Sequence, residues 1–408
     1  MTSRFRSTVV AACAVVFATV ASAQTTIQLG GKSTLTIKGF ISATVFTQDN
    51  QFTFGNGQNA EWPTPPQGTV DRWFEGGDVR NTRLTLVFDG PKVGGDWKVG
   101  ATFEMDFFGG FNGTGGFANS QPVPRLRLGF ADITNGSTTI RIGQQWAPLF
   151  GNVAVSLSHI AFPLGYGSGD IGWRFPGIFL YQNLTPKGAP VNADLALAVM
   201  QGSWNTPGST NDNTTAGNAS SPQYEARVNV GGKAGKGTWS TYLVGHYDNK
   251  DLSGANASAK NDKLTGSAWE VGAKVQQGPV MVQGNYYSGH SIGQNFGALA
   301  QFQNGIAAGA DHRDRIASQG GWGQVGFDIT PNWSLFAFYG LDDPKDNDIK
   351  ALGAAARDKN TMYSAMLRWR TGPYAIGFEY LQSVLITGVA PKVRTRGQQI
   401  ALSTLFNF

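Results

Sequence analysis

The sequence has few of the residues on which catalysis and metal binding usually depend. Its 408 residues include one cysteine and four histidines, at positions 159, 246, 290 and 312. No spacing among these histidines fits a metal site, and no serine with an orienting acid or amide can be assigned to His246 for hydrolysis. We therefore expect no catalytic residue, no metal and no cofactor, and a protein that is not an enzyme.

Charge and long apolar runs are also scarce. Charged residues make up 14% of the chain and the formal net charge is +5, while the mean hydropathy is −0.20. A mild positive excess is not the clustered basic surface of a nucleic-acid-binding protein, so we expect no nucleic-acid partner. Beyond the N-terminus, no stretch approaches the roughly 18 apolar residues that a membrane-spanning helix requires.

Residues 1–23 have the pattern of a secretory signal peptide. A basic start at Arg4 and Arg6 precedes an apolar core, and the small residues Ala21-Ser22-Ala23 form a cleavage site. The core is too short for a membrane anchor, which is the alternative interpretation. Cleavage would remove the single cysteine, so we expect the mature chain, residues 24–408, to contain no disulfide.

The end of the chain alternates between a mainly apolar parity and a mainly polar one. Ile400, Leu402 and Phe406 share one parity, while Gln399 and Ser403 lie on the other, and the pattern continues to the final Phe408. A period of two predicts a pleated strand with unlike faces. Such a strand at the chain end is typical of outer-membrane barrels, in which the first and last strands pair so that no sheet edge faces lipid.

The same alternation recurs along the chain and predicts sixteen strands. They cover residues 35–45, 84–88, 97–107, 126–130, 140–146, 173–181, 195–199, 224–230, 239–247, 269–275, 280–286, 323–329, 333–339, 362–370, 374–380 and 395–408. Charged residues in or beside these segments fall on the parity opposite the apolar stripe. A soluble β-sandwich would alternate in the same way, so this pattern excludes helices but not sandwiches.

The aromatic residues distinguish a barrel from a sandwich. Tryptophan and tyrosine lie at or near strand ends on the apolar parity, as at Trp269, Tyr339, Trp146, Trp173 and Tyr181. A membrane barrel needs amphipathic rings at both lipid interfaces, whereas a sandwich core tends to place bulky rings in mid-strand. The aromatic positions therefore favour strands that cross a membrane.

The connections alternate between short turns and long loops rich in glycine, asparagine, aspartate and serine. This alternation predicts an all-β fold, a transmembrane up-and-down antiparallel β-barrel of about 16 strands, wide enough for a water-filled channel. The third long connection, which runs from Ala147-Pro148-Leu149 to Pro163-Leu164, is much more apolar than the others. A surface loop has little reason to be so apolar, so we expect this one to fold into the lumen. We see no internal domain boundary and expect one barrel domain over residues 24–408.

Several charged residues are expected to project into this lumen on neighbouring strands. A row of guanidinium groups facing carboxylates would lower the barrier for anions and orient dipolar solutes. Alternatively, the arginines pair with the acidic residues of the third strand and merely solvate the wall. The expected pore-lining residues are Arg83, Glu104, Asp106, Arg125, Arg127, Arg141 and Arg174.

Short motifs in order along the chain resemble the trimeric general porins of Gram-negative outer membranes, and within them the DcaP-like porins. The motifs are Arg80-Asn81-Thr82-Arg83-Leu84, Glu104-Met105-Asp106-Phe107, Pro124-Arg125-Leu126-Arg127 and Gly143-Gln144-Gln145-Trp146. The resemblance implies a homotrimer of sixteen-stranded barrels in outer-membrane lipid and lipopolysaccharide. It also implies a third loop that narrows each pore and a basic constriction suited to small anions or other polar solutes.

Two other functions fit the sequence less well. One is a secreted, soluble all-β protein that binds a ligand such as a glycan with two sandwiches. The other is a substrate-specific barrel such as a sugar channel, in which inward-facing Trp322, Phe336 and Phe338 would form a stacking path.

Overall fold

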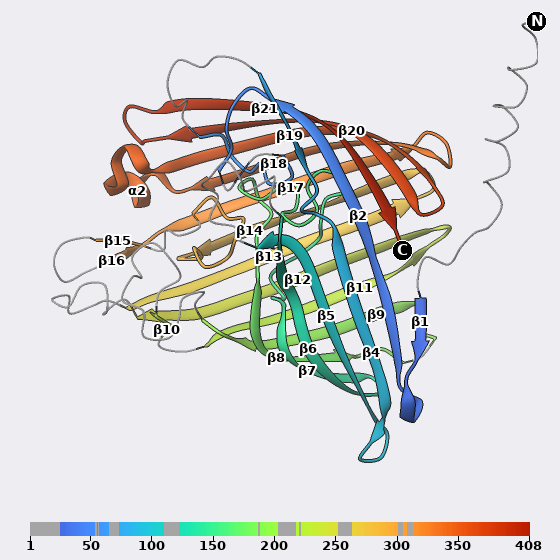
Figure 1. Cartoon of the computed structure of the whole chain (residues 1–408). Coiled ribbons are helices and arrows are strands. Elements are labelled where there is room, and N and C mark those ends of the chain that lie inside the picture. Colours follow the sequence, from blue (N-terminus) through green and yellow to red (C-terminus); the bar gives the residue numbers. More distant parts are fainter. Residues whose placement is uncertain are drawn as a thin grey trace, which may run out of the picture.

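The chain forms one closed antiparallel β-barrel in the computed structural model (Figure 1). The structure describes residues 25–53, 55, 57–64, 73–109, 122–186, 188–202, 218–219, 222–251, 263–300, 305–307 and 313–408. The expected signal peptide lies outside these residues and stays a prediction. Within the described part, the barrel wall has sixteen strands, as the alternation predicts. No helix in these ranges is long and apolar enough to cross a membrane.

The wall strands follow one another around the barrel in chain order. They are β2 (Thr34–Gln48), β3 (Phe74–Asp78) with β4 (Arg83–Val93), β5 (Trp97–Gly109), β6 (Val123–Asn135), β7 (Thr138–Trp146), β8 (Arg174–Asn183), β9 (Val191–Met200), β11 (Gln223–Ala234), β12 (Gly237–Asp251), β13 (Lys263–Gln277), β14 (Val280–His290), β17 (Ala317–Asp328), β18 (Trp333–Pro344), β19 (Arg357–Thr371), β20 (Tyr374–Thr387) and β21 (Val393–Asn407). Each predicted strand is present, and most extend further towards the long loops than the alternation indicates.

Smaller elements lie at the two rims. The strand β1 (Thr25–Gln28) and the 3₁₀ turn η1 (Gly30–Lys32) precede the first wall strand, and β1 forms a hairpin with β2. On the long-loop side are β10 (Asn218–Ala219), the hairpin of β15 (Gly305–Ala307) and β16 (Arg313–Arg315), the helix α2 (Asp346–Ile349) and the turn η3 (Lys350–Ala355). Residues 79–82 interrupt the second wall strand and divide it into β3 and β4, both of which pair with β2.

The last strand closes the barrel against the first. β21 pairs with β2 from Phe40 and Asn407 to Gln48 and Gln399. Beyond the ladder, the backbone amides of Gly39 and Phe408 each donate to the other residue's carbonyl at 3.0 Å. The chain end is therefore fixed in the seam, and the described wall strands leave no open sheet edge.

The outer face of the barrel is apolar and carries rings near its rims. On β2, Ile41 and Val45 are exposed while Ser42 and Thr44 between them are buried. Exposed rings include Trp269, Tyr286, Trp333, Tyr339 and Tyr363. This pattern fits a lipid-facing surface with aromatic girdles, as the sequence predicts. The described residues form one closed wall instead of two packed sheets, so the soluble two-sandwich alternative is wrong.

On β8, the sixth wall strand, the prediction of which side chains face lipid is wrong. The sequence assigns Phe175, Phe179 and Tyr181 to lipid, but Ile178 is 54% exposed and Phe179 is 0% exposed. The ring of Phe179 lies inside, stacked with that of Tyr181 at a centroid distance of 6.4 Å. Because Leu180 and Ile178 are as apolar as the rings, period-two alternation cannot decide which parity faces lipid on this strand.

Candidate pore constriction

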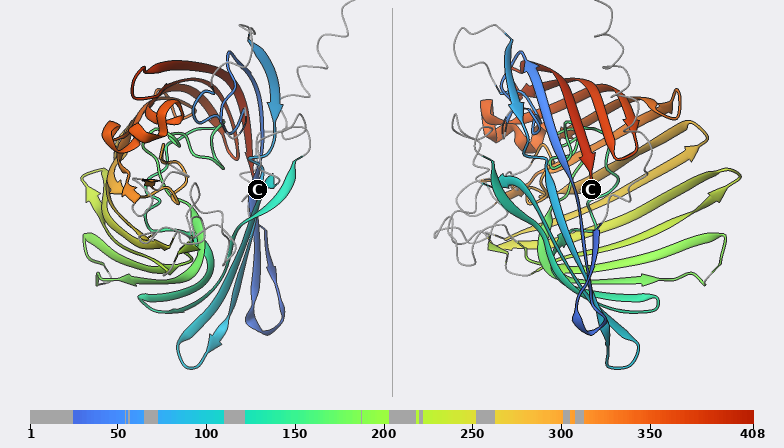
Figure 2. Two further views of the ribbon diagram at one scale, coloured as in Figure 1. Left: turned by 90° about the vertical axis from the view of Figure 1, so that its left-hand side faces the viewer. Right: turned by 45° about the vertical axis from the view of Figure 1, so that its right-hand side comes forward.

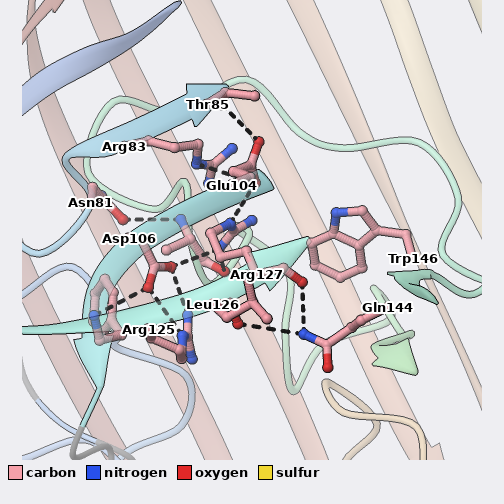
Figure 3. A network of polar contacts seen from close by, with 12 residues as sticks. Asn81, Arg83, Thr85, Glu104, Asp106, Arg125, Leu126, Arg127, Gln144 and Trp146 are labelled. Carbon is pink, nitrogen blue, oxygen red and sulfur yellow. Dashed lines mark hydrogen bonds and ion pairs between the residues drawn. The ribbon is translucent and has the colours of Figure 1, made fainter. Parts of the chain in front are cut away.

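Five of the predicted residues meet in one charged cluster on the inner face of β4, β5 and β6 (Figure 3). Arg125 binds Asp106 with two parallel contacts, Nε to Oδ1 at 3.0 Å and Nη2 to Oδ2 at 2.7 Å. Arg127 bridges both acids, with Nε 2.8 Å from Glu104 Oε1 and Nη1 2.7 Å from Asp106 Oδ2. Arg83 completes the group. We call these five residues the arginine cluster.

A β-bulge brings both arginines of β6 to the lumen side. The register between β5 and β6 shifts so that Glu104 pairs with Leu128 while Met105 pairs with Leu126, which leaves Arg127 between them without a ladder partner. A bulge of this kind re-aims the side chains that follow it. One consequence contradicts the sequence prediction: Leu128 and Phe130, expected to face lipid, take the inward side with their partners on β5.

The arginine cluster carries one uncompensated positive charge. Its three guanidinium groups face two carboxylates, so the sum is 3 − 2 = +1. The excess lies with Arg83, whose Nε is 3.8 Å from Glu104 Oε1 and whose Nε and Nη2 make no hydrogen bond. The side chains of Arg83 and Arg125 are 17% and 16% exposed, whereas that of Arg127 is 2% exposed. The pairing of arginines with Glu104 and Asp106 is therefore real, but it is incomplete.

Arg141 lies in a separate pair nearer the short turns. Its Nε and Nη2 each lie 2.8 Å from the carboxylate oxygens of Asp132, its cross-strand partner. The guanidinium carbon sits 3.5 Å from the ring centroid of Phe130, which the bulge has turned inward. This neutral pair is partly exposed, with the two side chains at 17% and 19%.

Arg174 is buried among aromatic rings at the start of β8. It shares the parity of Pro176 and Ile178, which face outward, and not that of the lumen-facing Phe175. Its guanidinium carbon lies 4.8 Å from the ring of Trp146 and 4.4 Å from that of Trp173. At 4% exposure its side chain is covered by these rings, and the Trp146 ring also lies 5.7 Å from the guanidinium carbon of Arg127. The role of Arg174 as a pore-lining residue stays a prediction. Trp146 and Trp173 pack inside the barrel against Phe150 and Phe162 of loop 3, not in an exposed girdle as the sequence predicts.

The third long loop, residues 147–173 (loop 3), crosses the lumen as its apolar sequence predicts (Figure 2, green trace inside the barrel). Polar side chains of the barrel wall form hydrogen bonds with the backbone of loop 3. The contacts run from Leu149 N to Glu225 Oε2 at 2.7 Å, Asn152 N to Tyr242 Oη at 3.3 Å, Val155 N to Gln324 Oε1 at 2.7 Å, Asn81 Nδ2 to Ser158 O at 2.7 Å and Ala161 N to Asn81 Oδ1 at 2.9 Å. Loop 3 thus follows the wall from β11 past β17 and returns beside β4.

The sequence prediction misses the residues that anchor loop 3. Gln324 makes two contacts with the Val155 backbone, and Glu379 accepts from the Ser156 hydroxyl at 2.8 Å. Asn81 lies in the interruption between β3 and β4, where its amide reaches the loop. In the sequence these anchors look only like polar residues on the inward side of the wall. Lumen residues that merely contact water have the same pattern, so the sequence does not distinguish the two.

Loop 3 also buries acidic residues on the wall opposite the arginine cluster, on β11 and β13, and one on β20. Glu225, Glu270 and Glu379 are each less than 5% exposed. Glu225 accepts from the backbone of Leu149, Glu379 accepts from Ser156, and Glu270 accepts from the hydroxyl of Tyr242, which also contacts Asn152. These carboxylates are engaged in holding the loop, so the partly exposed arginines have more access to the lumen than the acids across from them.

No group of three or more histidine, cysteine, aspartate or glutamate side chains in the described ranges could hold a metal ion. No family model matches the sequence, and no curated protein matches it.

Solved structures are similar in fold. The outer membrane channel DcaP of Acinetobacter baumannii aligns over 94% of this chain and 99% of its own, with 19% identity and a TM-score of 0.71. The anion-selective porin from Comamonas acidovorans aligns over 92% and 100%, with 13% identity and a TM-score of 0.55. The outer membrane protein OmpT of Vibrio cholerae in its trimer form aligns over 92% and 99%, with 11% identity and a TM-score of 0.53. The sixteen-stranded porin fold expected from the sequence is therefore confirmed.

Proposed function

We propose that this protein is an outer-membrane porin, a water-filled channel for passive diffusion of small hydrophilic solutes that favours anions. The arginine cluster carries the proposal. It places an uncompensated positive charge on a partly exposed inner wall, opposite carboxylates that loop 3 covers. In a protein-lined constriction the effective dielectric is below that of bulk water, so this charge acts strongly on a passing ion. The pore-lining residues in this proposal are Arg83, Glu104, Asp106, Arg125, Arg127 and Arg141.

The barrel surface supports a location in the outer membrane. Its outer face is apolar between aromatic rims, as contact with lipid and lipopolysaccharide requires. Export through the predicted signal peptide would deliver the chain to the periplasm.

We also propose a homotrimer. The wall is lowest at β7, β8 and β9, which have 9, 10 and 10 residues against 15 in β12 and β13, and a low wall suits contact with a second copy.

The sugar-channel alternative has less support from the inner wall. Trp322 and Phe338 do stack, with centroids 5.7 Å apart. However, both rings are buried in one apolar cluster with Ala154 and Leu164 of loop 3. A stacking path must present its rings to the solute, and these rings are covered. No enzymatic activity is part of the proposal.

Planar bilayer recordings on the purified protein test the proposal. We expect discrete conductance steps and, under a KCl gradient at low salt, a reversal potential on the anion-selective side. A folded protein that inserts without conducting would refute the channel, and a cation-selective reversal potential would refute the assigned role of the arginine cluster.

A further inference from the structure

A second loop is buried inside the barrel besides loop 3. Residues 291–300, between β14 and β15, are buried at every position, and we call this segment loop 6. Seven of them, at positions 291, 292, 294, 295, 298, 299 and 300, are 1% exposed or less. A connecting segment that includes polar residues such as Ser291, Gln294 and Asn295 has no reason to be this buried unless it packs on other parts of the protein.

Loop 6 is joined to loop 3 through backbone hydrogen bonds. Gly167 N donates to Gly297 O at 2.6 Å, and Gly172 N donates to Phe296 O at 2.8 Å. The ring of Phe296 lies 4.6 Å from that of Trp173 and 5.5 Å from that of Tyr166, measured between centroids. Two backbone bonds and an aromatic cluster hold the return limb of loop 3 against loop 6.

Loop 6 is also fastened to the barrel wall at both ends. Near its start, Gln294 Nε2 contacts His246 Nε2 at 2.8 Å and also bonds Asp248, both on β12. Near its end, Leu299 N donates to Asp342 on β18 at 3.0 Å, and Arg357 on β19 donates to Leu299 O at 2.7 Å. Loop 6 therefore bridges two distant parts of the wall across the lumen.

Part of the first long loop, residues 57–64 (loop 1), completes the packing. Trp62 lies in an apolar cluster with Leu299 of loop 6. Gly167 of loop 3 has φ +76°, and a side chain there would collide with the Trp62 ring. Ala60 packs with Ala154 and Leu164 of loop 3. Each of the three loops thus contacts the other two.

We infer that loops 1, 3 and 6 form a single packed body that fills the lumen beside β11 to β20 and confines solutes to a strip along the arginine cluster. Loop 6 is then a second constriction element, and the size limit of the channel depends on it as well as on loop 3. The inference rests on the proposed channel function. It goes further because it assigns the size limit of the channel partly to loop 6, which the sequence analysis does not predict to fold inward.

The test compares single-channel conductance and the exclusion of neutral polyethylene glycols of graded size. One variant replaces residues 293–298 with two glycines, which removes the contacts of Gln294 and Phe296. The other is Phe296→Ala, which keeps the loop length and removes only the ring that packs on loop 3. Phe378→Ala is the matched control, because Phe378 is 53% exposed on the outer face of β20. Heat-modifiable migration in gels shows which variants have folded.

We expect the loop replacement to raise conductance at least threefold and to admit larger polymers. Phe296→Ala should raise conductance by about half and increase open-channel noise, while Phe378→Ala should match the wild type. If a folded loop variant keeps both the conductance and the polymer limit of the wild type, the inference is overturned. If the loop replacement does not fold, Phe296→Ala decides by the same criterion. A wild-type protein that does not conduct would instead overturn the channel function itself.

Discussion

The charge of the arginine cluster can be changed in single steps at sites that leave its paired core in place. Arg83→Gln removes the guanidinium whose Nε and Nη2 make no hydrogen bond, which brings the cluster to 2 − 2 = 0. Glu104→Gln removes one carboxylate and brings it to 3 − 1 = +2. Because Arg127 would still bind Asp106 in both variants, the two substitutions should differ mainly in charge.

The expected size of the effect follows from Coulomb's law. A unit charge about 8 Å from a passing ion, at an effective dielectric constant of about 20, contributes about 2 kcal/mol. At about 0.1 M salt, screening reduces this to about 1 kcal/mol, and at about 1 M it nearly disappears. Since about 1.4 kcal/mol corresponds to a tenfold change, each step should alter the barrier for one ion sign about fivefold at low salt.

Reversal potentials in planar bilayers under a KCl gradient measure this shift. We expect Arg83→Gln to move the potential towards cations, Glu104→Gln to move it towards anions, and both shifts to shrink as salt rises. Conductance should change less than selectivity. The reasoning fails if the two variants move the potential in the same direction, or if Arg83→Gln keeps the wild-type value at low salt.

The remaining predictions concern the seam, the topology and loop 3. Deleting Phe408 removes both hydrogen bonds to Gly39, so unfolded protein should accumulate in the periplasm; normal yields of folded barrel would contradict this. Tags at Gly217 and Gly254, which lie outside the described residues, should be labelled on intact cells, and tags at Gly232 and Gly372 only after the envelope is opened; the reverse pattern would invert the orientation. Changing both Arg83 and Arg127 to Ala brings the cluster to 1 − 2 = −1 and should shift selectivity towards cations further than Arg83→Gln does; equal shifts would show that Arg127 has no influence on the path. Burial, with the nearby charge of Glu270, raises the pKa of the Asp170 carboxyl well above its usual range. Ionisation therefore costs the folded state stability as pH rises above the unfolded pKa of about 3.9, and Asp170→Asn should resist urea better than the wild type at pH 8, with little difference at about pH 3; no gain at pH 8 would contradict the assignment.

Much of the barrel could be predicted from sequence because its determinants are local. A strand that faces lipid on one side and water on the other must alternate at period two, and most of the sixteen wall strands do so over part of their length. The inward course of loop 3 was also visible, because the apolar residues from Ala147 to Leu164 would be costly in water.

Alternation fails where both faces of a strand are apolar or where the register shifts. On β8 the inner face carries Phe175 and Phe179 under loop 3 and the outer face carries Ile178, so the inside of the barrel is as apolar as the outside. At the bulge beside Glu104, Arg127 has no ladder partner, and the residues after it change sides. Either feature inverts an assignment made from parity, as it did for Phe179 on β8 and for Phe130 after the bulge.

The sequence by itself determined the barrel, its closing strand and the arginines of β4 and β6. Only the tertiary structure decided which charges remain partly uncompensated, because ion pairs between Arg127, Glu104 and Asp106 depend on register and not on spacing along the chain. It alone also placed loop 6 in the lumen. Loop 6 mixes polar residues such as Gln294 and Asn295 with apolar ones such as Phe296 and Leu299. All of them are buried because loops 1 and 3, distant in sequence, supply the partners for its backbone and rings.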